Sequence, residues 1–431
     1  MLALLSVLAL AAAACGDGDG DGDGEAEPDA PQDLSGETVE VAAVWTGTEQ
    51  ESFQQVLSAF SEQTGAETQF TSTGDDVAAV LGTRIEGGDP PDVAFLPQPG
   101  LMADLAEQDA LIPIEDVAGD EVDANYSQDW RDLGSIDGTL YGVWFKAANK
   151  STVWYNTNVF EQAGVSAPED WDGMMSAAQT VSDFGVTPWS IGGADGWTLT
   201  DWFENVYIRT AGPEMYDQLT NHEIPWTDQS VKDALTRLAE IFENQDMLAG
   251  NPLQTDFPTS VANVFANPDS PDAAMVYEGD FVAGVISGET GSTVGEDADF
   301  FNFPSIDGSP LAVVGGGDVA VLLTDSEAGR ALMEFLASPE AGEVWAGLGG
   351  FTSPNQNVDL SVYPDDITRR SAEALATAET FRFDMSDLQP AEFGGTVGQG
   401  LFSLFQDFLA DPSAIDQVTE QMEQEASQAF G

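Results

Sequence analysis

Residues 38–71 read TVEVAAVWTGTEQESFQQVLSAFSEQTGAETQFT and contain the clearest structural pattern in the chain. The first eight residues have the apolar character of a strand. The following segment places Phe53, Val56, Leu57 and Phe60 at the i, i+3, i+4 and i+7 spacing of a helix with one apolar face. Gly65 is expected to end this helix, and residues 67–71 again resemble a strand. The pattern predicts a strand–helix–strand unit.

The alternation continues along the chain. Helices are expected over 77–85 and 102–110, with a strand over 92–96 between them. Later strands are expected over 150–155, 273–277 and 311–323, a helix begins near Leu332, and the tail from about Ile367 is expected to be helical. Strands that alternate with helices predict an α/β fold with a mostly parallel sheet covered on both faces. Open α/β sheets bind ligands beyond the carboxyl ends of their strands, so the site is expected in those loops.

The charge balance restricts the possible partners. The 431 residues include 76 acidic and 11 basic side chains, for a formal net charge of -65. Such a field repels nucleic acid, anionic lipids and anionic solutes, so we expect a neutral or cationic ligand and no nucleic-acid partner. A dense acidic composition with three lysines also resembles proteins that work in concentrated salt, and we hypothesise salt adaptation.

Cysteine and histidine usage excludes several kinds of site. The chain has one cysteine, Cys15, and one histidine, His222. This leaves no internal disulfide, thiolate zinc cluster, histidine-paired metalloprotease helix or ordinary hydrolase triad. An Asp-x-Asp-x-Asp-Gly run starts at Asp17, but Pro28 stands where a calcium loop needs its bidentate Glu. No metal or cofactor is predicted.

The N-terminus has the composition of an export signal. Residues 2–14 are apolar and end in small side chains before Cys15. We interpret residues 1–14 as a signal peptide, Cys15 as a lipidated cysteine, and the acidic Gly/Asp-rich residues 15–36 as a flexible tether. The alternative is a free cysteine after a core helix. No later run of about eighteen apolar residues predicts a membrane-spanning helix.

Six stretches, in order along the chain, carry a family resemblance. They are GGDPPDVAFLPQPG (87–100), YGVWFK (141–146), KSTVWYN (150–156), WTLTD (197–201), AAMVYEGDF (273–281) and GGFTSPN (349–355). Together they resemble the extracellular solute-binding proteins of carbohydrate importers, most closely the α-glucoside-binding branch, from about Val39 to the C-terminus.

The resemblance implies an architecture and a function. It implies two α/β lobes joined by a hinge, with the ligand held in the cleft between them. Lobe 1 would comprise 37–146 and 309–365, and lobe 2 would comprise 147–308 and 366–431. The function implied is that of a monomeric, lipid-anchored, extracytoplasmic protein. It would bind a neutral sugar such as maltose, sucrose or trehalose and deliver it to an ABC permease, without being an enzyme.

A sugar offers C–H faces that stack on aromatic rings and hydroxyls that need charged or amide partners. Trp45 and Glu49 lie where the first strand ends and the first helix begins, so both could contact such a ligand. Alternatively, Trp45 packs in the core and Glu49 stabilises the start of the helix through its dipole. Gln98 is either an amide contact or a surface turn residue. Lys146 is either a ligand contact or simply the partner of a surplus carboxylate.

Further candidates come from later loops. Trp197 and Asp201 follow a glycine-containing loop, whereas Trp202 and Phe203 are expected to pack inside. The predicted strand at 273–277 is followed by four candidates, Glu278, Gly279, Asp280 and Phe281. In maltose-binding relatives the matching stretch places an aromatic ring on the sugar, which here would be Phe281, while Asp280 departs from their proline.

Three candidates come from the last third of the chain. Asp318 follows the glycine run 315–317, which allows close backbone approach. Phe351 is a possible stacking ring. Arg382 either contacts the ligand or supports a cleft acid through a bidentate pair.

Three other functions compete with sugar binding. A glycosidase needs paired carboxylates, but 76 acids make chance pairs uninformative. A binding protein for a polyamine would also use aromatic rings and carboxylates. A lipid-anchored adhesion module would explain the anchor but not a buried cleft.

Overall fold

The computed structural model describes residues 33–376, 378 and 380–431. The predicted signal peptide at 1–14, Cys15 and most of the 15–36 tether lie outside these residues. Within them, no helix combines the length and the apolar character needed to cross a bilayer.

Three strand–helix units open the described chain, as the sequence pattern predicts. They are β1 (Thr38–Ala43), α1 (Gly47–Thr64), β2 (Glu67–Ser72), α2 (Val77–Glu86), β3 (Val93–Leu96) and α3 (Pro99–Glu107). The predicted apolar face of α1 is buried, and Gly65 ends the helix in the left-handed conformation with φ of 79°. The third helix begins three residues earlier than expected, because Pro99 is favourable in a first turn, where no intrahelical N–H bond is lost.

These strands belong to a six-stranded sheet with β6 (Gly142–Asn149), β11 (Val313–Leu322) and β12 (Phe381–Phe383). The strand order is β12-β11-β3-β1-β2, and β6 pairs with β11. β1 runs parallel to β2 and β3, but β11 runs antiparallel to β3 and β6. The prediction of a mostly parallel sheet is therefore wrong for the β11 side. β11 enters from the edge at which β1 and β3 end, so it must run in the opposite direction.

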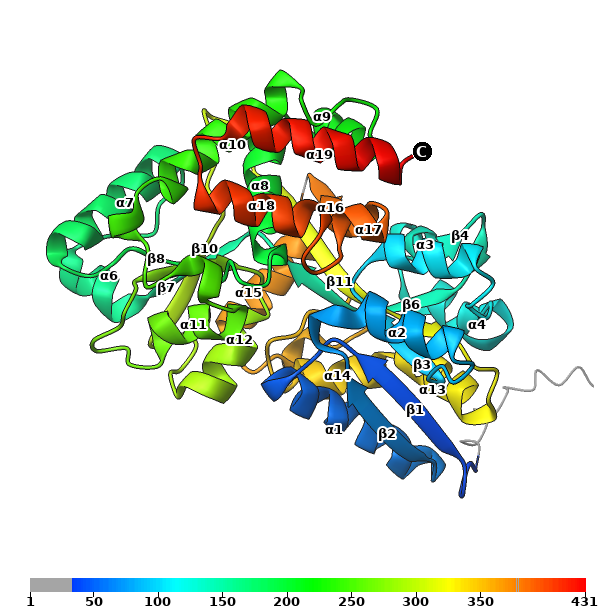
Figure 1. The fold of residues 1–431 in the computed structure, drawn as a ribbon. Coiled ribbons are helices and arrows are strands. Elements are labelled where there is room, and N and C mark those ends of the chain that lie inside the picture. Colours follow the sequence, from blue (N-terminus) through cyan, green and yellow to red (C-terminus); the bar gives the residue numbers. More distant parts are fainter. Residues whose placement is uncertain (1–32, 377, 379) are drawn as a thin grey trace, which may run out of the picture. The chain divides into compact units, whose positions relative to one another are not determined.

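A four-stranded sheet has the order β10-β7-β9-β8. Its strands are β7 (Thr152–Asn156), β8 (Trp189–Ser190), β9 (Met275–Glu278) and β10 (Ala298–Asn302). β7 is antiparallel to β9 and β10, whereas β8 is parallel to β9. Figure 1 shows this sheet among the helices from the middle of the chain, separate from β1 and β2.

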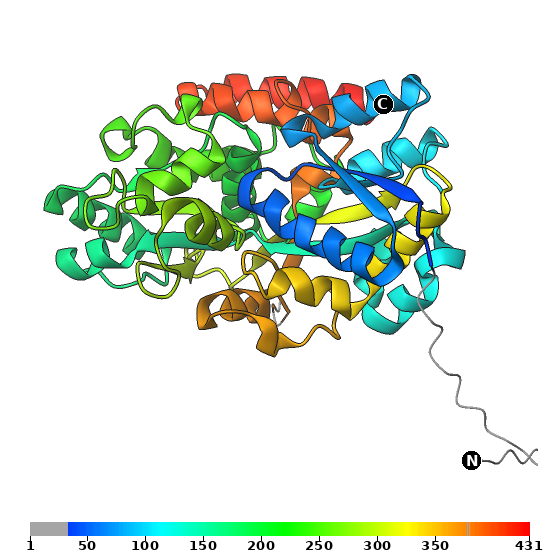
Figure 2. The same cartoon turned by 90° about the horizontal axis from the view of Figure 1, so that it is seen from below.

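The remaining helices cover the two sheets (Figures 1 and 2). They are α4 (Glu115–Asn125), α5 (Gln128–Leu133), α6 (Thr157–Ala163), α7 (Trp171–Phe184), α8 (Trp197–Thr210), α9 (Pro213–Thr220), α10 (Gln229–Phe242), α11 (Phe257–Phe265), α12 (Val282–Val285), α13 (Glu327–Ala337), α14 (Pro339–Ala346), α15 (Asp366–Ala376), α16 (Met385–Leu388), α17 (Ala391–Gly394), α18 (Gly400–Ala410) and α19 (Ile415–Ala429). Short helical turns include η1 (Gly74–Asp76) and η4 (Ile286–Thr290), and β4 (Ser135–Ile136) pairs with β5 (Thr139–Leu140).

The C-terminal tail is mostly helical, as predicted, but β12 was not expected there. It has only three residues, too few for a period-two pattern to be recognised, and it pairs with the start of β11.

The hydrophobic core divides along β6 and β11. Phe145 belongs to the core of the six-stranded sheet, whereas Ala148 packs in a core beside the other sheet. In the same way Val319 and Val314, five residues apart on β11, belong to different cores. The fold is therefore two-lobed, and β6 and β11 pass from one core to the other.

Candidate functional site

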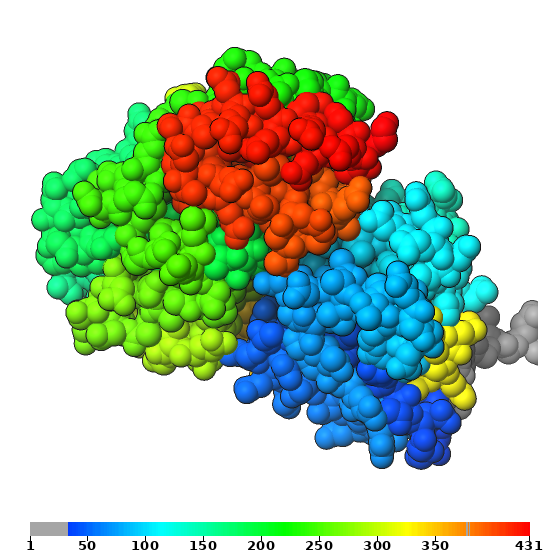
Figure 3. Space-filling view, viewed as in Figure 1, coloured from blue at the N-terminus to red at the C-terminus, as the bar shows by residue number. Residues whose placement is uncertain are grey.

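The ends of three parallel strands bring side chains to one cavity. Trp45 follows β1, Asp75 follows β2 and Gln98 follows β3, at the edge where α/β sheets bind ligands. The cavity has a volume of about 360 Å³, within the range of small-molecule sites. Figure 3 shows a hollow where the blue N-terminal segments meet the green and orange segments.

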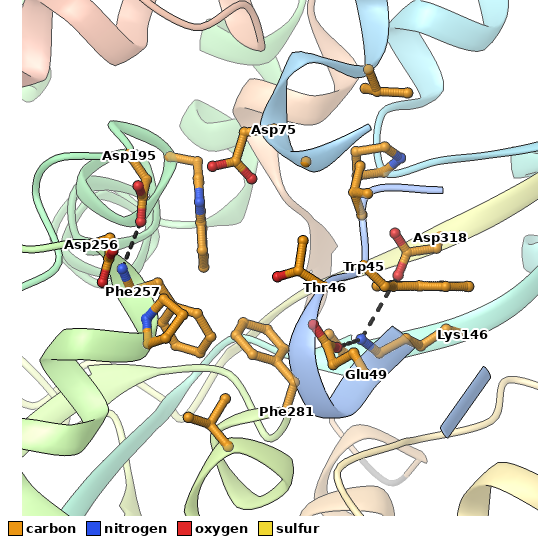
Figure 4. A pocket seen from close by; sticks show the side chains of 18 of the residues that line it. Trp45, Thr46, Glu49, Asp75, Lys146, Asp195, Asp256, Phe257, Phe281 and Asp318 are labelled. Carbon is orange, nitrogen blue, oxygen red and sulfur yellow. Dashed lines mark hydrogen bonds and ion pairs between the residues drawn. The ribbon is translucent and has the colours of Figure 1, made fainter. Parts of the chain in front are cut away.

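Segments from both sheets line this cavity. The lining residues include Trp45, Thr46, Thr48, Glu49, Asp75, Gln98, Lys146, Ala148, Lys150, Asp195, Trp197, Asp256, Phe257, Phe281, Val285, Glu289, Gly317, Asp318, Asp387 and Phe402. Of the predicted site residues, the structure therefore brings together Trp45, Glu49, Gln98, Lys146, Trp197, Phe281 and Asp318. Figure 4 labels five of them, Trp45, Glu49, Lys146, Phe281 and Asp318.

One charged group of the cavity is built around Lys146 on β6. Its Nζ bonds to Glu49 in the first turn of α1 and lies 3.9 Å from the Asp318 carboxylate on β11. Burial opposes the charge, but Glu49 and Asp318 hold the pKa of Lys146 above its usual value, so the amine stays an ammonium. Burial raises the pKa of Asp318 to about 6, against the effect of Lys146. Lys146 is thus both a cavity residue and an ion-pair partner, two roles that the sequence left as alternatives.

Aromatic rings surround this ammonium. Lys146 Nζ lies 5.8 Å from the Trp45 ring centroid, 5.5 Å from Phe281 and 5.3 Å from Trp345. Trp45 also packs 4.7 Å from Phe53 and is 2% exposed. Trp45 therefore packs in the core and also lines the cavity, so the two roles considered for it do not exclude each other.

Rings from the other core form the opposite wall. Trp197 starts α8, and its ring centroid lies 5.4 Å from Phe257 and 6.0 Å from Phe281. Gly279 lets the Phe281 ring fold back, because a Cβ on Gly279 would lie 2.3 Å from that ring. As expected, Trp202 and Phe203 are buried inside.

A second charged group is built around Lys150, just after β6. Its Nζ lies 2.5 Å from Asp384, 3.3 Å from Asp201 and 3.6 Å from Asp387. Burial opposes the charge, but these carboxylates hold the pKa of Lys150 well above its usual value. The ammonium also lies 5.7 Å from the Trp197 ring centroid.

Buried acids extend behind this lysine. Asp201, Glu204 and Asp384 each place a carboxylate oxygen within 4.8 Å of the others, a group that could hold a cation. They come from segments nearly two hundred residues apart, so no spacing in the sequence could predict them. The Lys150 ammonium already contacts Asp201 and Asp384, and Glu204 accepts hydrogen bonds from the Met385 and Ser386 backbone.

Six predicted residues do not line the cavity. Asp201 and Glu278 are completely or almost completely buried behind it, with exposed fractions of 0% and 1%. The Asp280 carboxylate points away, accepting a hydrogen bond from Thr352, and the Gly279 carbonyl accepts one from Trp154. For all four the reason is that the segments after β9 and at the start of α8 turn these groups into the core.

The other two lie elsewhere. Phe351 is buried against Trp345, with stacked rings whose centroids are 5.1 Å apart. Arg382 makes a bidentate ion pair with Asp217 on α9, with N–O distances of 2.5 and 2.8 Å. This bidentate pair was foreseen, but Asp217 is not a cavity acid.

Gln98 has a structural role at the cavity. It is buried, contrary to the alternative of a surface turn, and its Nε2 donates to the Gly395 carbonyl at 2.8 Å. This bond joins the loop after β3 to the segment between α17 and α18.

The sequence analysis missed several lining residues, among them Thr46, Thr48, Lys150, Phe257 and Asp387. Lys150 had a usable signal, because Lys146, Ala148 and Lys150 occupy alternate positions of β6 and its extended continuation and therefore share a face. Phe257 and Asp387 had none, since only the fold brings them to the cavity.

Comparison with known proteins identifies the family. The bacterial extracellular solute-binding protein family matches residues 45–343. The chain belongs to this family. The solute-binding protein is 38% identical over 386 residues to the osmoprotective compounds-binding protein GgtB of Synechocystis sp., covering 87% of this chain and 89% of that one. It is 36% identical over 404 residues to the alpha-glucosides-binding periplasmic protein AglE of Rhizobium meliloti, covering 89% and 86%.

Solved structures support the same fold. The bacterial solute receptor AcbH, described as having an exclusive preference for β-D-galactopyranose, aligns with a TM-score of 0.81 at 20% identity, over 91% of this chain and 99% of that chain. A chitin oligosaccharide binding protein aligns with a TM-score of 0.78 at 21% identity, over 91% and 98%. The solute-binding protein is thus a substrate-binding component of a carbohydrate ABC transporter, located outside the cytoplasm. Proteins of this kind deliver small molecules to permease subunits and are not enzymes.

Proposed function

We propose that this solute-binding protein captures a neutral α-glucoside and passes it to its ABC permease. The ligand class comprises disaccharides such as maltose, sucrose and trehalose, together with osmoprotective glucosides. The names of the two relatives, which refer to α-glucosides and to osmoprotective compounds, support this class.

The observation that carries the proposal is the pairing of aromatic rings with fixed charged groups in one cavity. Trp45, Trp197 and Phe281 offer faces for sugar C–H groups. Lys146 donates and Glu49 accepts hydrogen bonds, and their mutual ion pair holds both in place before a ligand arrives. Binding such a ligand therefore costs little side-chain ordering.

Closure around the ligand would use the two-lobed fold. We propose lobe 1 as 37–146 with 309–365 and lobe 2 as 147–308 with 366–431, turning about the shared strands β6 and β11. The change of core along both strands supports this division. A ligand that touches rings on both sides favours the closed state by its differential affinity.

Residues outside the described part complete the proposal. Residues 1–14 would direct export, Cys15 would carry the lipid, and residues 15–36 would tether a monomer to the outer face of the cell membrane. More than one acyl chain is needed for stable anchoring.

The protein is proposed to bind its sugar without chemical change. Sustained release of monosaccharide from maltose, sucrose or trehalose by the pure protein would contradict this, and would favour a glycosidase.

A polyamine is a second candidate, favoured by one observation. Asp75, Asp195 and Asp256 line the cavity, and no ion pair with a Lys or Arg is found for them among the described residues. Asp195 and Asp256 accept backbone hydrogen bonds from Phe257 and Thr259, and such a group of acids without a basic partner would suit an ammonium.

Calorimetry on the purified protein in high salt tests the proposal. Maltose, trehalose, sucrose and glucosylglycerol are expected to bind, and a ligand at about 100 times its Kd should add ~2.7 kcal/mol of stability. Putrescine and spermidine are the comparison. If either amine stabilises the protein more than every neutral glycoside does, the ligand is a polyamine and the sugar proposal is wrong.

A further inference from the structure

Five buried acidic side chains gather around Lys150, behind the cavity. They are Asp201 and Glu204 on α8, Glu278 at the end of β9, and Asp384 and Asp387 at α16. Within the described part of the chain, Lys150 is the basic side chain that forms ion pairs with this group, at 2.5 Å from Asp384 and 3.3 Å from Asp201. One ammonium cannot offset five carboxylates, so the group has a surplus of buried negative charge.

Three of these acids converge on one point. Asp201, Glu204 and Asp384 each bring a carboxylate oxygen within 4.8 Å of the others. The backbone holds two of them in place, because the Met385 N–H donates to Glu204 at 2.7 Å and the Asp387 N–H donates to Asp384 at 3.1 Å. Oxygen ligands lie about 2.3–2.6 Å from Ca²⁺, so two ligands on opposite sides of the ion are about 5 Å apart. The spacing of the three oxygens therefore suits one calcium ion.

Carboxylate oxygens that meet no hydrogen-bond donor give independent support for a bound cation. Among the described residues, neither oxygen of Glu278 nor Oδ2 of Asp201 has a hydrogen-bond partner, although these side chains are 1% and 0% exposed. The two carboxyl groups lie beside each other. Buried polar atoms are normally paired. One shared proton would pair two of these three oxygens, whereas a metal ion can accept all three.

The chemistry of the group selects the kind of ion. Its side-chain ligands are all carboxylates, which suit hard cations rather than zinc or copper. Mg²⁺ keeps several of its waters when it binds to proteins, which fits an exposed site better than side chains that are 0–1% exposed. A monovalent ion would offset less of the surplus charge than Ca²⁺ does.

We infer that Asp201, Glu204 and Asp384, with Glu278 beside Asp201, form a structural calcium site behind the cavity. The ion joins α8 to the segment at α16. It also fixes the acids that orient Lys150, and so stiffens this wall of the cavity. The inference goes beyond the proposed function, because it does not depend on which solute the cavity binds.

The full protein, stripped of metal with a chelator, allows a direct test. In about 1 M KCl, which screens the surface acids, Ca²⁺ should raise the melting midpoint by several degrees, and Mg²⁺ at the same concentration should raise it much less. Calorimetry should give one calcium ion per chain.

Terbium, which replaces calcium in oxygen-ligand sites, locates the ion. The hydroxyl groups of Tyr216 and Tyr277 donate at 2.9 Å to the Glu204 carboxylate and the Asp201 carbonyl. Excitation of these tyrosines should therefore sensitise Tb³⁺ emission. Emission lifetimes in H₂O and D₂O should show fewer bound waters than for Tb³⁺ on an exposed carboxylate.

Two variants examine the site without changing side-chain size. Asp201→Asn and Glu278→Gln each remove one acid from a buried surplus of acids, so both should fold. Each should weaken Ca²⁺ binding about 10-fold or more, because affinity depends on the number of charged ligands. Asp246→Asn removes an equal charge at an exposed position and should keep the calcium affinity.

The outcomes decide between the site and its alternatives. If Ca²⁺ and Mg²⁺ raise the midpoint equally, or if the two variants respond to Ca²⁺ as the unmodified protein does, surface acids cause the effect and the inference is wrong. If Ca²⁺ has no effect, protons alone neutralise the group and the inference is again wrong. Sugar binding is measured separately and stands in either case.

Discussion

Trp197 is the ring of the cavity whose contribution can be measured most cleanly. It is half-buried and lies across the cavity from Trp45. Trp197→Ala removes a stacking face and should weaken glycoside binding by roughly 10- to 100-fold, which corresponds to ~1.4–3 kcal/mol. Calorimetry on the folded variant measures this loss.

The control for this prediction is another half-buried tryptophan. Trp130 packs 5.5 Å from Trp144, and Trp130 does not line the cavity. Trp130→Ala should lower the melting midpoint but keep the affinity. Equal loss of affinity in both variants would mean that Trp197 acts only through stability.

Asp280 shows how burial at a single residue affects the pH dependence of stability. Burial raises its pKa from 3.8 to about 6, against the opposing hydrogen bond from Thr352. The folded state therefore binds this proton more tightly than the unfolded state does. The protonated Asp280 carboxyl therefore contributes most to the free energy of unfolding below about pH 4, and this contribution is lost as the pH rises to about 6.

Asp280→Asn should remove this loss. Relative to the unmodified protein, the variant should gain stability between about pH 4 and 6, by up to ~3 kcal/mol at ~1.4 kcal/mol per pKa unit, and the gain should be constant above pH 7. Denaturant unfolding at fixed salt measures it. Asp109→Asn removes an equal charge at an exposed position, and a matching pH profile there would attribute the effect to net charge instead.

At the scale of elements, two glycines let segments far apart in the sequence approach closely. Thr48 on α1 packs against Gly288 in η4, where a Cβ would lie 2.0 Å from the threonine Oγ1. In the second contact, a Cβ at Gly100 in α3 would lie 2.0 Å from the Gln389 carbonyl. The first of these contacts joins the two cores, because α1 packs in the core of the six-stranded sheet and Ile286 of η4 packs in the core beside the other sheet.

Gly288→Ala should therefore disturb the approach of α1 to η4. The added methyl group forces α1 and η4 apart, and ligand affinity should fall several-fold, while the melting midpoint without ligand changes little because neither core is altered. Calorimetry together with the ligand-free melting midpoint measures both effects. Gly82→Ala, in open space on α2, should keep the affinity and stabilise by up to ~1 kcal/mol. Unchanged affinity in Gly288→Ala would show that closure does not depend on this contact.

At the scale of the whole molecule, self-repulsion dominates the electrostatics. The 76 acidic side chains are opposed by only 11 basic ones, which leaves a formal net charge of -65. Most of the described ion pairs involve an exposed or half-exposed partner, and such pairs contribute little individually. Added salt screens the repulsion, since the screening length falls from about 10 Å at 0.1 M to about 3 Å at 1 M.

The melting midpoint should therefore rise between low and multimolar KCl. The rise should appear without ligand, because its cause is the charge of the whole surface. A scanning measurement at fixed pH tests it, with trimethylamine N-oxide at matched osmolality as the control for solvent exclusion. A midpoint that stays constant or falls would contradict salt adaptation.

Local pattern was enough to predict much of the architecture. The three N-terminal strand–helix units, the end of α1 at Gly65 and the buried positions of α1 follow from periodicity and from glycine at a left-handed position. Trp45, Glu49 and Gln98 were identified because strand ends converge at one edge of such a sheet, and Asp318 because it follows a glycine run. These features depend on neighbours in sequence or on one general rule of topology.

Tertiary structure decided the rest. Asp201, Glu278 and Asp280 follow the same kind of loop signal, yet they lie behind the cavity, because the direction of a side chain depends on how its segment turns against the core. Asp384 and Asp387 meet Lys150 although more than two hundred residues separate them, and Phe257 joins Trp197 across another gap. Such meetings result from packing two cores around β6 and β11, and no local spacing encodes the packing of distant segments.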